Sequence, residues 1–427
     1  MTRYLVLAII LTMTIPVNTA CSQSAETTSL KDLIEEAINN NPVIQKVYNE
    51  WEASGYQTEQ AASLPDPIAK YTYFGESVET RVGPQENKYG IAQEIPFPAK
   101  LGMKKIAASR HAGVLKEEYE ASKQEIVKKV KFVYYDMFWV DKAIQVIEGE
   151  KAILESQESV ARKKYELKLA PQQDVIKAQV ELSKLINKLL FLRQNRESLE
   201  AKLNNVLGRQ IDTPVGQLED VEPAEFNYEL DELHRIAGES RQELVASRLN
   251  VERAEYEKSL AMMDYIPDVT LGFEYIQVGK GETTQPNDGQ DAWMASVAFS
   301  VPLWVDRISS KIKEKKALLE STRKDYRSTQ NDVYYEVEDT YFKINTYRDV
   351  IALYETALIP QSEQSLNASK TAYETGIVDF LNWLEAERVL LQTKLAYYRA
   401  IVDFEKSIAY LERVIGRYLE GEKNVSE

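Results

Sequence analysis

The amino-acid sequence predicts a mainly α-helical chain that also carries β-strands and that contains two copies of one unit. Glycine and proline, which interrupt helices, number only 17 and 14 among 427 residues. Short segments recur in the second half of the chain at a separation of 208 residues. Each half also contains two stretches in which apolar and polar residues alternate, as in a strand with one apolar face. Together these observations predict two helical units, each with a pair of strands.

Matching motifs define the duplication. Three pairs of segments share the separation of 208 residues: Tyr165-Glu166 with Tyr373-Glu374, Ala178-Gln179 with Ala386-Glu387, and Val206-Leu207-Gly208-Arg209 with Val414-Ile415-Gly416-Arg417. Two more pairs are 202 and 206 residues apart: Leu64-Pro65-Asp66 with Ile266-Pro267-Asp268, and Ile95-Pro96-Phe97 with Val301-Pro302-Leu303. Solenoid repeats have periods of roughly 20 to 50 residues, so this is a duplication of a domain-sized unit.

The duplication divides the chain into five parts. Residues 1–20 are expected to be a signal peptide, 21–209 the first repeat and 230–417 the second. Residues 210–229 contain two prolines and several acids, and we expect a linker that packs against the helices. Residues 418–427 are polar, and we expect a mobile tail.

The N-terminus has the pattern of a secretory signal. Arg3 precedes an apolar run from Leu5 to Val17, and small residues lead to Cys21. The run is too short to cross a bilayer comfortably, and the alternative is a buried N-terminal helix. Cys21 stands where cleavage is expected, which predicts a lipoprotein acylated on Cys21, although Asn18 occupies the position where such signals usually carry leucine.

Composition excludes several classes of function. The formal net charge of −15 argues against binding to nucleic acid and against binding to anionic lipid through a basic patch. One cysteine allows no intrachain disulfide, and with only two histidines it cannot build a zinc site of Cys and His ligands. The sequence contains no glycine-rich phosphate loop and no serine-centred elbow motif. We therefore expect no enzyme, no cofactor and no metal site.

Long helices are expected in both repeats. Ser29 to Asp32 has capping-box spacing and opens a helix that continues towards Ser63 and stops at Leu64-Pro65-Asp66-Pro67. Lys100 to Glu166 contains no proline, which predicts a helix about 100 Å long. Leucines at spacings of three and four predict coiled-coil packing, although an ordinary helical bundle would show the same period. The leucines in question form two rows, Leu182, Leu185, Leu189 and Leu192 in the first repeat, and Leu381, Leu384, Leu391 and Leu395 in the second.

The alternating stretches predict four strands of about 10 to 12 residues, the length of a tilted membrane strand. They include residues 70–73, 89–97, 269–275 and 293–303, with polar loops at Gly83 to Glu86 and at Gly279 to Gln290. Four strands cannot close a barrel, and an open sheet edge is not tolerated in lipid. Two chains would supply eight strands and three would supply twelve, and only the larger number leaves an open lumen. The alternative is a small soluble sheet that caps a bundle.

With its duplication, its proline-bounded strand pairs and its helical hairpin tips, the chain resembles the TolC family of outer-membrane efflux proteins. The family's tip has the form Tyr-x-x-Gly, which the second repeat carries at Tyr373 to Gly376, whereas the first repeat has Lys168 in place of the glycine. The resemblance implies a homotrimer with a 12-stranded β-barrel in the outer membrane and an α-helical barrel in the periplasm. It also implies that the tips dock onto a periplasmic adaptor that couples to an inner-membrane pump.

The resemblance assigns site residues at the two tips. It implies that the adaptor docks on Lys168, Leu169, Ala170, Pro171, Gly376, Ile377 and Val378. The family's periplasmic gate is lined by acidic residues just after the tips, and the matching positions are Asp174, Asn382 and Glu385. Asn382 departs from the usual aspartate, so one ring of charge is missing. Each of these residues would otherwise be an ordinary polar residue on a solvated helix face.

The cargo is a finer expectation. Leu64-Pro65-Asp66-Pro67, Gly83-Pro84-Gln85-Glu86 and Ile95-Pro96-Phe97 resemble the branch of the family that serves heavy-metal cation pumps. Two alternatives stay open: the same duct serving drug export or protein secretion, and a periplasmic coiled-coil scaffold or adaptor without a pore.

Overall fold

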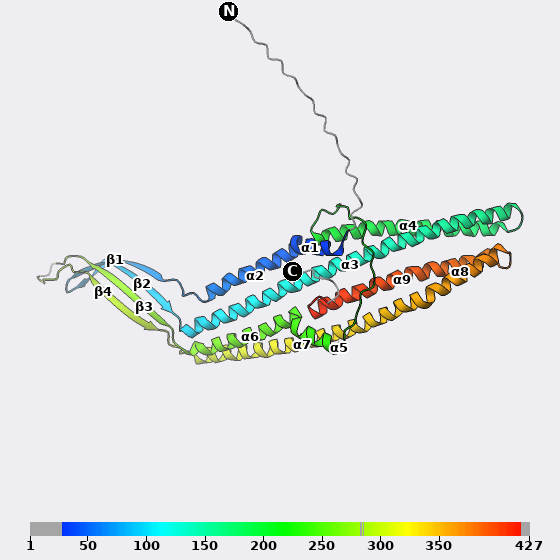
Figure 1. Cartoon of the computed structure of the whole chain (residues 1–427). Coiled ribbons are helices and arrows are strands. Elements are labelled where there is room, and N and C mark those ends of the chain that lie inside the picture. Colours follow the sequence, from blue (N-terminus) through cyan, green and yellow to red (C-terminus); the bar gives the residue numbers. More distant parts are fainter. Residues whose placement is uncertain (1–27, 282–283, 285, 420–427) are drawn as a thin grey trace, which may run out of the picture.

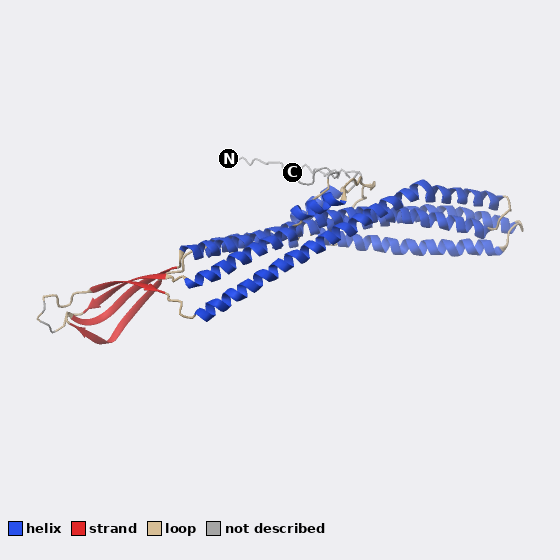
Figure 2. Cartoon of the chain, turned by 90° about the horizontal axis from the view of Figure 1, so that it is seen from below, coloured by secondary structure: helices blue, strands red, loops and turns tan. Residues whose placement is uncertain are grey.

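The computed structural model describes residues 28–281, 284 and 286–419. The expected signal peptide and Cys21 lie outside the described residues. The molecule is elongated, with a β-sheet at one end and two helical hairpin tips at the other (Figure 1). The helices run side by side along most of its length (Figure 2). No helix among the described residues is both long enough and apolar enough to cross a membrane.

Both repeats have the same order of elements: two helices in line, two strands, a long helical segment, a tip and a returning helix. The first contains α1 (Leu30–Asn40), α2 (Pro42–Ala61), β1 (Ile68–Thr80), β2 (Gly83–Ile95), α3 (Pro98–Glu166) and α4 (Gln172–Leu207). The second contains α5 (Leu230–Ser240), α6 (Gln242–Met262), a 3-10 turn (Met263–Tyr265), β3 (Val269–Val278), β4 (Ala292–Phe299), α7 (Val305–Leu353), a π-helical turn (Tyr354–Leu358), α8 (Ile359–Glu374) and α9 (Phe380–Ile415).

The first helix is not continuous to Ser63 as expected. It is divided at Asn41, whose backbone is extended, because Pro42 disfavours the helical conformation in the residue before it. The side chain of Asn41 caps α2 by accepting the Val43 N–H at 2.8 Å. The second repeat has the same division at Arg241, although no proline follows it.

The expected long helix is confirmed. α3 has 69 residues, which corresponds to a length of about 100 Å. Its counterpart in the second repeat is interrupted by the π-helical turn, in which the Ile359 N–H bonds to the Tyr354 carbonyl. Pro360 follows at the start of α8 and has no N–H to donate, so the irregularity lies where regular hydrogen bonding fails.

The helix ends explain the repeated Gly-Arg motif. α4 ends at Gly208 and α9 at Gly416, both with φ of +73°. A Cβ on Gly416 would lie 2.5 Å from the Ser240 carbonyl oxygen, and a Cβ on Gly208 would lie 2.9 Å from the Asn40 carbonyl oxygen. Each glycine therefore fits against the break between the two helices that open its own repeat. Arg209, next to Gly208, forms an ion pair with Glu36 in α1.

The strands form one antiparallel sheet in the order β1-β2-β3-β4. The segment Gly83 to Glu86, expected as a loop, belongs to β2, because Thr80 pairs directly with Gly83 and leaves a turn of two residues. β4 ends at Phe299, so Val301 and Leu303 lie beyond the strand instead of inside it.

The expected alternation of faces is confirmed by the register. Tyr71, Tyr89, Tyr275 and Trp293 are aligned across all four strands, and Tyr89 and Trp293 are 48% and 70% exposed. The neighbouring row on the opposite face consists of Lys70, Gly90, Glu274 and Met294. The sheet therefore has one exposed apolar face and one face of small and polar residues.

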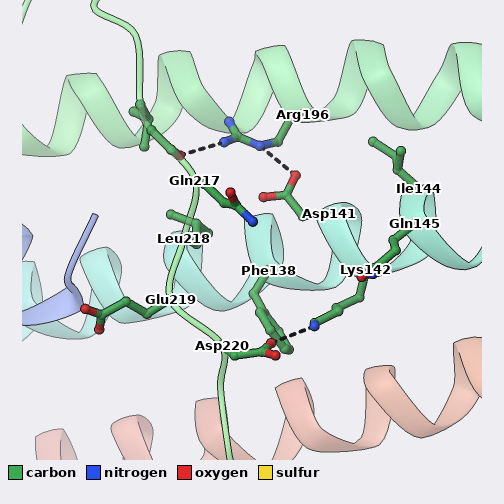
Figure 3. A pocket seen from close by; sticks show the side chains of 12 residues that line it. Phe138, Asp141, Lys142, Ile144, Gln145, Arg196, Gln217, Leu218, Glu219 and Asp220 are labelled. Carbon is green, nitrogen blue, oxygen red and sulfur yellow. Dashed lines mark hydrogen bonds and ion pairs between the residues drawn. The ribbon is translucent and has the colours of Figure 1, made fainter. Parts of the chain in front are cut away.

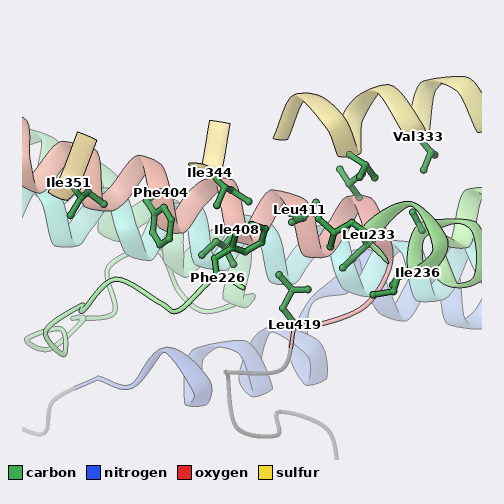
Figure 4. Close-up of a cluster of buried hydrophobic side chains, with 14 of the residues drawn as sticks. Phe226, Leu233, Ile236, Val333, Ile344, Ile351, Phe404, Ile408, Leu411 and Leu419 are labelled. Carbon is green, nitrogen blue, oxygen red and sulfur yellow. The ribbon is translucent and has the colours of Figure 1, made fainter. Parts of the chain in front are cut away.

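An apolar cluster packs the helices of the second repeat against one another and against the linker. In the cluster of Figure 4, Phe404 and Leu411 of α9 pack with Ile344 of α7 and with Phe226 of the linker. Leu419 is buried in the same cluster, so the second residue of the expected tail is still packed against the helices.

The linker crosses the helices over a cavity of about 870 Å³. Asp220 pairs with Lys142 at 2.6 Å, and Arg196 pairs with Asp141 at 2.8 Å along the same cavity (Figure 3). Leu218 and Phe226 are buried against the helices. Residues 210–229 are thus held to the helical wall by both apolar and ionic contacts.

Candidate functional site

The two tips lie side by side at the end of the molecule opposite the sheet (Figures 1 and 2). Their backbone hydrogen bonds match pair by pair. The Leu169 N–H bonds to the Lys164 carbonyl at 2.7 Å, and the Ile377 N–H bonds to the Ala372 carbonyl at 2.8 Å. This six-residue closure is the Schellman motif, which ends a helix sharply and satisfies its last carbonyls.

The lysine at the first tip does not change the turn. Lys168 has a φ of +63° and Gly376 a φ of +76°, so both occupy the left-handed region that the motif requires. Lysine is strained there by its Cβ, whereas glycine is not. The two tips therefore share one backbone conformation, and their side chains differ.

The tip residues present apolar surface. Leu169 is 73% exposed and Ile377 is 79% exposed, at equivalent positions of the two motifs. Lys168, Pro171 and Gly376 are also exposed, while Ala170 and Val378 are partly buried.

The two tips are joined directly. The Lys164 ammonium donates to the Tyr373 carbonyl at 2.9 Å and lies 4.0 Å from the centre of the Tyr373 ring. Tyr373 contacts Phe380, which contacts Trp383, with ring centroids 5.6 and 5.3 Å apart. All three aromatic side chains are buried. This aromatic column fixes the second tip, and Lys164 attaches the first tip to it.

A groove of about 590 Å³ lies between α4 and α9 just behind the tips. Ile176, Val180 and Leu381 give it an apolar lining, and each of these side chains is between 46% and 51% exposed. Its charged residues are Lys177, Glu181, Lys184 and Arg388. The groove, hereafter the tip groove, is an apolar trough with charges of both signs, a surface suited to another amphipathic helix.

Of the three expected gate residues, Asp174 is 8% exposed and lies in the first turn of α4. The pKa of its carboxyl is raised, mainly by burial and further by the nearby negative charge of Asp379. The positive charges of Lys177 and Lys164 reduce this rise. The side chain of Asp174 thus lies at the junction of the two hairpins.

Asn382 and Glu385 are exposed on α9. The Asn382 N–H bonds to the Asp379 side chain at 3.0 Å, so Asp379 caps the helix. Glu385 pairs with Arg388 at 2.8 Å, and Arg388 also lies 3.5 Å from Glu181 of α4. Glu385 is thereby connected through Arg388 to the other hairpin.

The sequence did not reveal a carboxyl pair between α3 and α9. Glu387 is 2% exposed, and its Oε1 has no hydrogen-bond partner among the described residues. Burial raises the pKa of the neighbouring Glu150 carboxyl, and the interaction with Glu387 raises it further. In the sequence neither residue differs from the other acids on these charged helices, because their proximity depends on packing between segments 237 residues apart.

Among the described residues, no group of three or more His, Cys, Asp or Glu side chains is placed to hold a metal ion. The tip region instead combines exposed apolar ends, an apolar groove and a charged network that crosses between the hairpins.

The sequence is similar to those of outer-membrane proteins. Residues 233–417 match the model of the family described as outer membrane efflux protein. Outer membrane protein TolC of Vibrio cholerae serotype O1 is 20% identical over 319 residues, covering 73% of this chain and 72% of that relative.

Solved structures share the fold over nearly the whole chain. The outer membrane protein VceC from Vibrio cholerae superposes with a TM-score of 0.76 at 18% identity, covering 92% of this chain and 97% of VceC. CusC, described as forming a transmembrane channel, superposes with a TM-score of 0.78 at 14% identity, covering 91% and 92% of the two chains. The mostly helical architecture with four strands is that of these outer-membrane proteins, and the matches support the outer membrane efflux family.

Proposed function

We propose that this chain is one protomer of a homotrimeric outer-membrane efflux channel, the exit duct for cargo delivered by an inner-membrane pump through a periplasmic adaptor. The observation that carries the proposal is the sheet. Its apolar face is exposed, and among the described residues β1 pairs only with β2 and β4 only with β3. Both edges therefore leave backbone groups that need partners in lipid. Three copies joined edge to edge would supply twelve strands.

The helices support association of the same kind. α4 exposes Ile186, Leu190 and Phe191, and α7 exposes Tyr335 and Phe342, each more than 40%. Apolar surface of this extent on long helices is typical of an unoccupied interface. Packing of these faces between protomers would continue the helical wall around a lumen.

The adaptor would dock at the tips. The exposed Leu169 and Ile377 supply apolar contacts, and the tip groove accepts an amphipathic helix. Lys168, Leu169, Ala170 and Pro171 would contact it from the first tip, and Gly376, Ile377 and Val378 from the second. Because the tips share a backbone and differ in side chains, the two contacts would be unequal.

The gate proposal rests on Asn382 and Glu385, which are exposed on α9 behind the second tip. Asp174 is buried, so we assign it to the contact between the hairpins, where it would act on the gate indirectly. Opening would require Arg388 to release Glu181, since this contact links α9 to α4.

The heavy-metal cargo is supported by the motifs before β1, at the start of β2 and at its end, together with the net charge of −15. An acidic chain favours the passage of cations. Expression of the chain with candidate pumps and adaptors, followed by tolerance tests with metal salts and with drugs, would separate metal export from drug export.

The central experiment is reconstitution of the purified protein in a planar bilayer. Discrete conductance steps together with a trimeric mass in detergent are expected. A monomer that gives no conductance would refute the channel and favour the periplasmic scaffold.

Lipid anchoring at Cys21 remains part of the proposal, although Cys21 lies outside the described residues. Mass spectrometry of the mature N-terminus should detect an acylated Cys21. An unmodified Cys21, or cleavage beyond it, would refute the anchor and leave the channel proposal intact.

A further inference from the structure

A further pocket lies where the sheet meets the long helices, far from the tips. It has a volume of about 350 Å³ and is formed by the segments directly before β3 and after β4 and by the first turns of α3 and α7. We call it the junction pocket; its polar lining includes Lys100, Asp264, Asp268, Ser300, Arg307 and Lys311.

The charges of the junction pocket do not cancel. Lys100 is buried and binds Asp268 at 2.9 Å, and Lys311 binds Asp264 at 2.6 Å. Arg307 is exposed, and in the described part of the chain no carboxylate lies within ion-pairing distance of it. Three cationic and two anionic side chains leave one positive charge in the pocket, carried by a guanidinium that is free to bind an anion.

The surrounding segments are basic although the whole chain is acidic. Residues 98–110 contain three lysines and one arginine with no acidic residue. Residues 305–316 contain five basic and two acidic residues. These two segments form a basic band where the helices leave the sheet, within which Asp268, Asp264 and Glu257 pair with Lys100, Lys311 and Lys315.

Exposed apolar side chains lie beside this band. Val301, Leu303 and Trp304 are 68%, 73% and 73% exposed, and they connect β4 to the helix that carries Arg307. Tryptophan next to basic side chains is typical of the level of lipid headgroups, where the ring is amphipathic and the charged group reaches the phosphate. Surfaces that bind a soluble anion do not need such apolar neighbours.

We propose that the junction pocket binds the phosphate of a membrane phospholipid, with Arg307 as its principal ligand and the acyl chains against Leu303 and Trp304. The proposal rests on the proposed function, because it requires the sheet to lie in a membrane with the helices outside it. Guanidinium groups suit phosphate since they donate two parallel hydrogen bonds. The Ser300 hydroxyl accepts the Asp268 N–H at 2.8 Å, which leaves its own proton to donate at the pocket.

The test is native mass spectrometry of the detergent-solubilised protein titrated with phosphatidylglycerol. Arg307→Gln is the test variant, and Lys313→Gln is the matched control, because Lys313 is exposed on the same helix and does not line the pocket. Losing a hydrogen-bonded charge pair predicts about tenfold weaker binding of phosphatidylglycerol to Arg307→Gln. Lys313→Gln should bind like the unchanged protein.

Two further arms separate the sources of phosphate. Diacylglycerol, which lacks the phosphate, should bind weakly to all three proteins, and inorganic phosphate alone should not be retained. Equal lipid binding by the two variants, or retention of inorganic phosphate without phosphatidylglycerol, would overturn the site. The conductance of the unchanged protein in a planar bilayer is measured alongside. If it is normal and the two variants bind phosphatidylglycerol equally, only this site is refuted. If there is no conductance, the channel itself is refuted.

Discussion

Three glycines share one backbone conformation and differ in what surrounds them, so their replacement by alanine isolates the effect of packing. Gly208, Gly376 and Gly416 have φ values of +73°, +76° and +73°. A Cβ on Gly376 would meet nothing within 4 Å, whereas a Cβ on Gly416 would lie 2.5 Å from a backbone oxygen. The helix end at Gly416 should therefore be far less tolerant than the tip.

The expected magnitudes follow from two contributions. Holding alanine in the left-handed region costs roughly 1–2 kcal/mol, and the stiffer unfolded chain returns about 0.4–1 kcal/mol. Gly376→Ala should thus lose about 1 kcal/mol. Overpacking adds about 1–3 kcal/mol where the neighbour cannot move aside. At Gly416 the neighbours are the Ser240 carbonyl and the Arg241 Cα, so Gly416→Ala should lose about 2–4 kcal/mol.

Gly208→Ala should fall between the other two variants, since its closest backbone contact would be 2.9 Å. Denaturant unfolding in detergent, followed by circular dichroism at constant m-value, measures the three losses. Gly149→Ala is the control: Gly149 lies inside α3 with nothing within 4 Å, so alanine should stabilise the helix by about 0.5–1 kcal/mol.

Equal losses at Gly376 and Gly416 would refute the reasoning. They would mean that backbone conformation alone explains the repeated Gly-Arg motif and that the fit against the helix breaks contributes nothing.

Gly376→Val should impair efflux while trimers still form, because the tip turn needs positive φ; normal export tolerance in cells would contradict the tip assignment. Glu385→Gln should raise leak conductance or alter cation block, since it weakens the contact with Arg388; unchanged traces would remove Glu385 from the gate. The raised pKa of Glu150 means that the folded state keeps a proton that the unfolded state releases, so stability should fall as pH rises from about 5 towards 9. Measured as the melting temperature at several pH values, this pH dependence should be flatter in Glu150→Gln and unchanged in the control Glu148→Gln. If Glu150→Gln shows the same pH dependence as the unchanged protein, the carboxyl pair is not the cause of that dependence.

Much of the fold could be predicted because its signals are local. Absence of proline over Lys100 to Glu166 predicts the long helix, and alternation predicts the strands, since each depends on neighbours within a few residues. The mistakes lie at ends and breaks. The first helix is divided at Asn41 because Pro42 follows it, and β2 begins at Gly83 because Thr80 pairs with it across a two-residue turn. Both causes are local, but a difference of one residue in a break or a turn moves the end of an element, so boundaries are predicted less accurately than the elements themselves.

The candidate site was predicted only in part. The tip positions followed from the repeated motif, and the left-handed turn appears at Lys168 as well as at Gly376. Sequence reasoning placed Asp174 with Asn382 and Glu385, whereas the structure buries Asp174 and leaves the other two exposed. Whether a particular acid is buried depends on which neighbouring helix packs against it. The pattern of residues within its own helix does not specify that neighbour.

The sequence by itself determined the duplication, the length of the longest helix, the two-faced strands and the helix-ending turns, because these follow from composition and short-range spacing. Only the tertiary structure decided which charges meet. The Lys164 contact with Tyr373 spans 209 residues, and the proximity of Glu150 to Glu387 spans 237. Likewise, the positive charge of the junction pocket is visible only where segments of both repeats converge. The free energy of a charge depends on its surroundings in three dimensions, so packing between distant segments determines what each charged residue does.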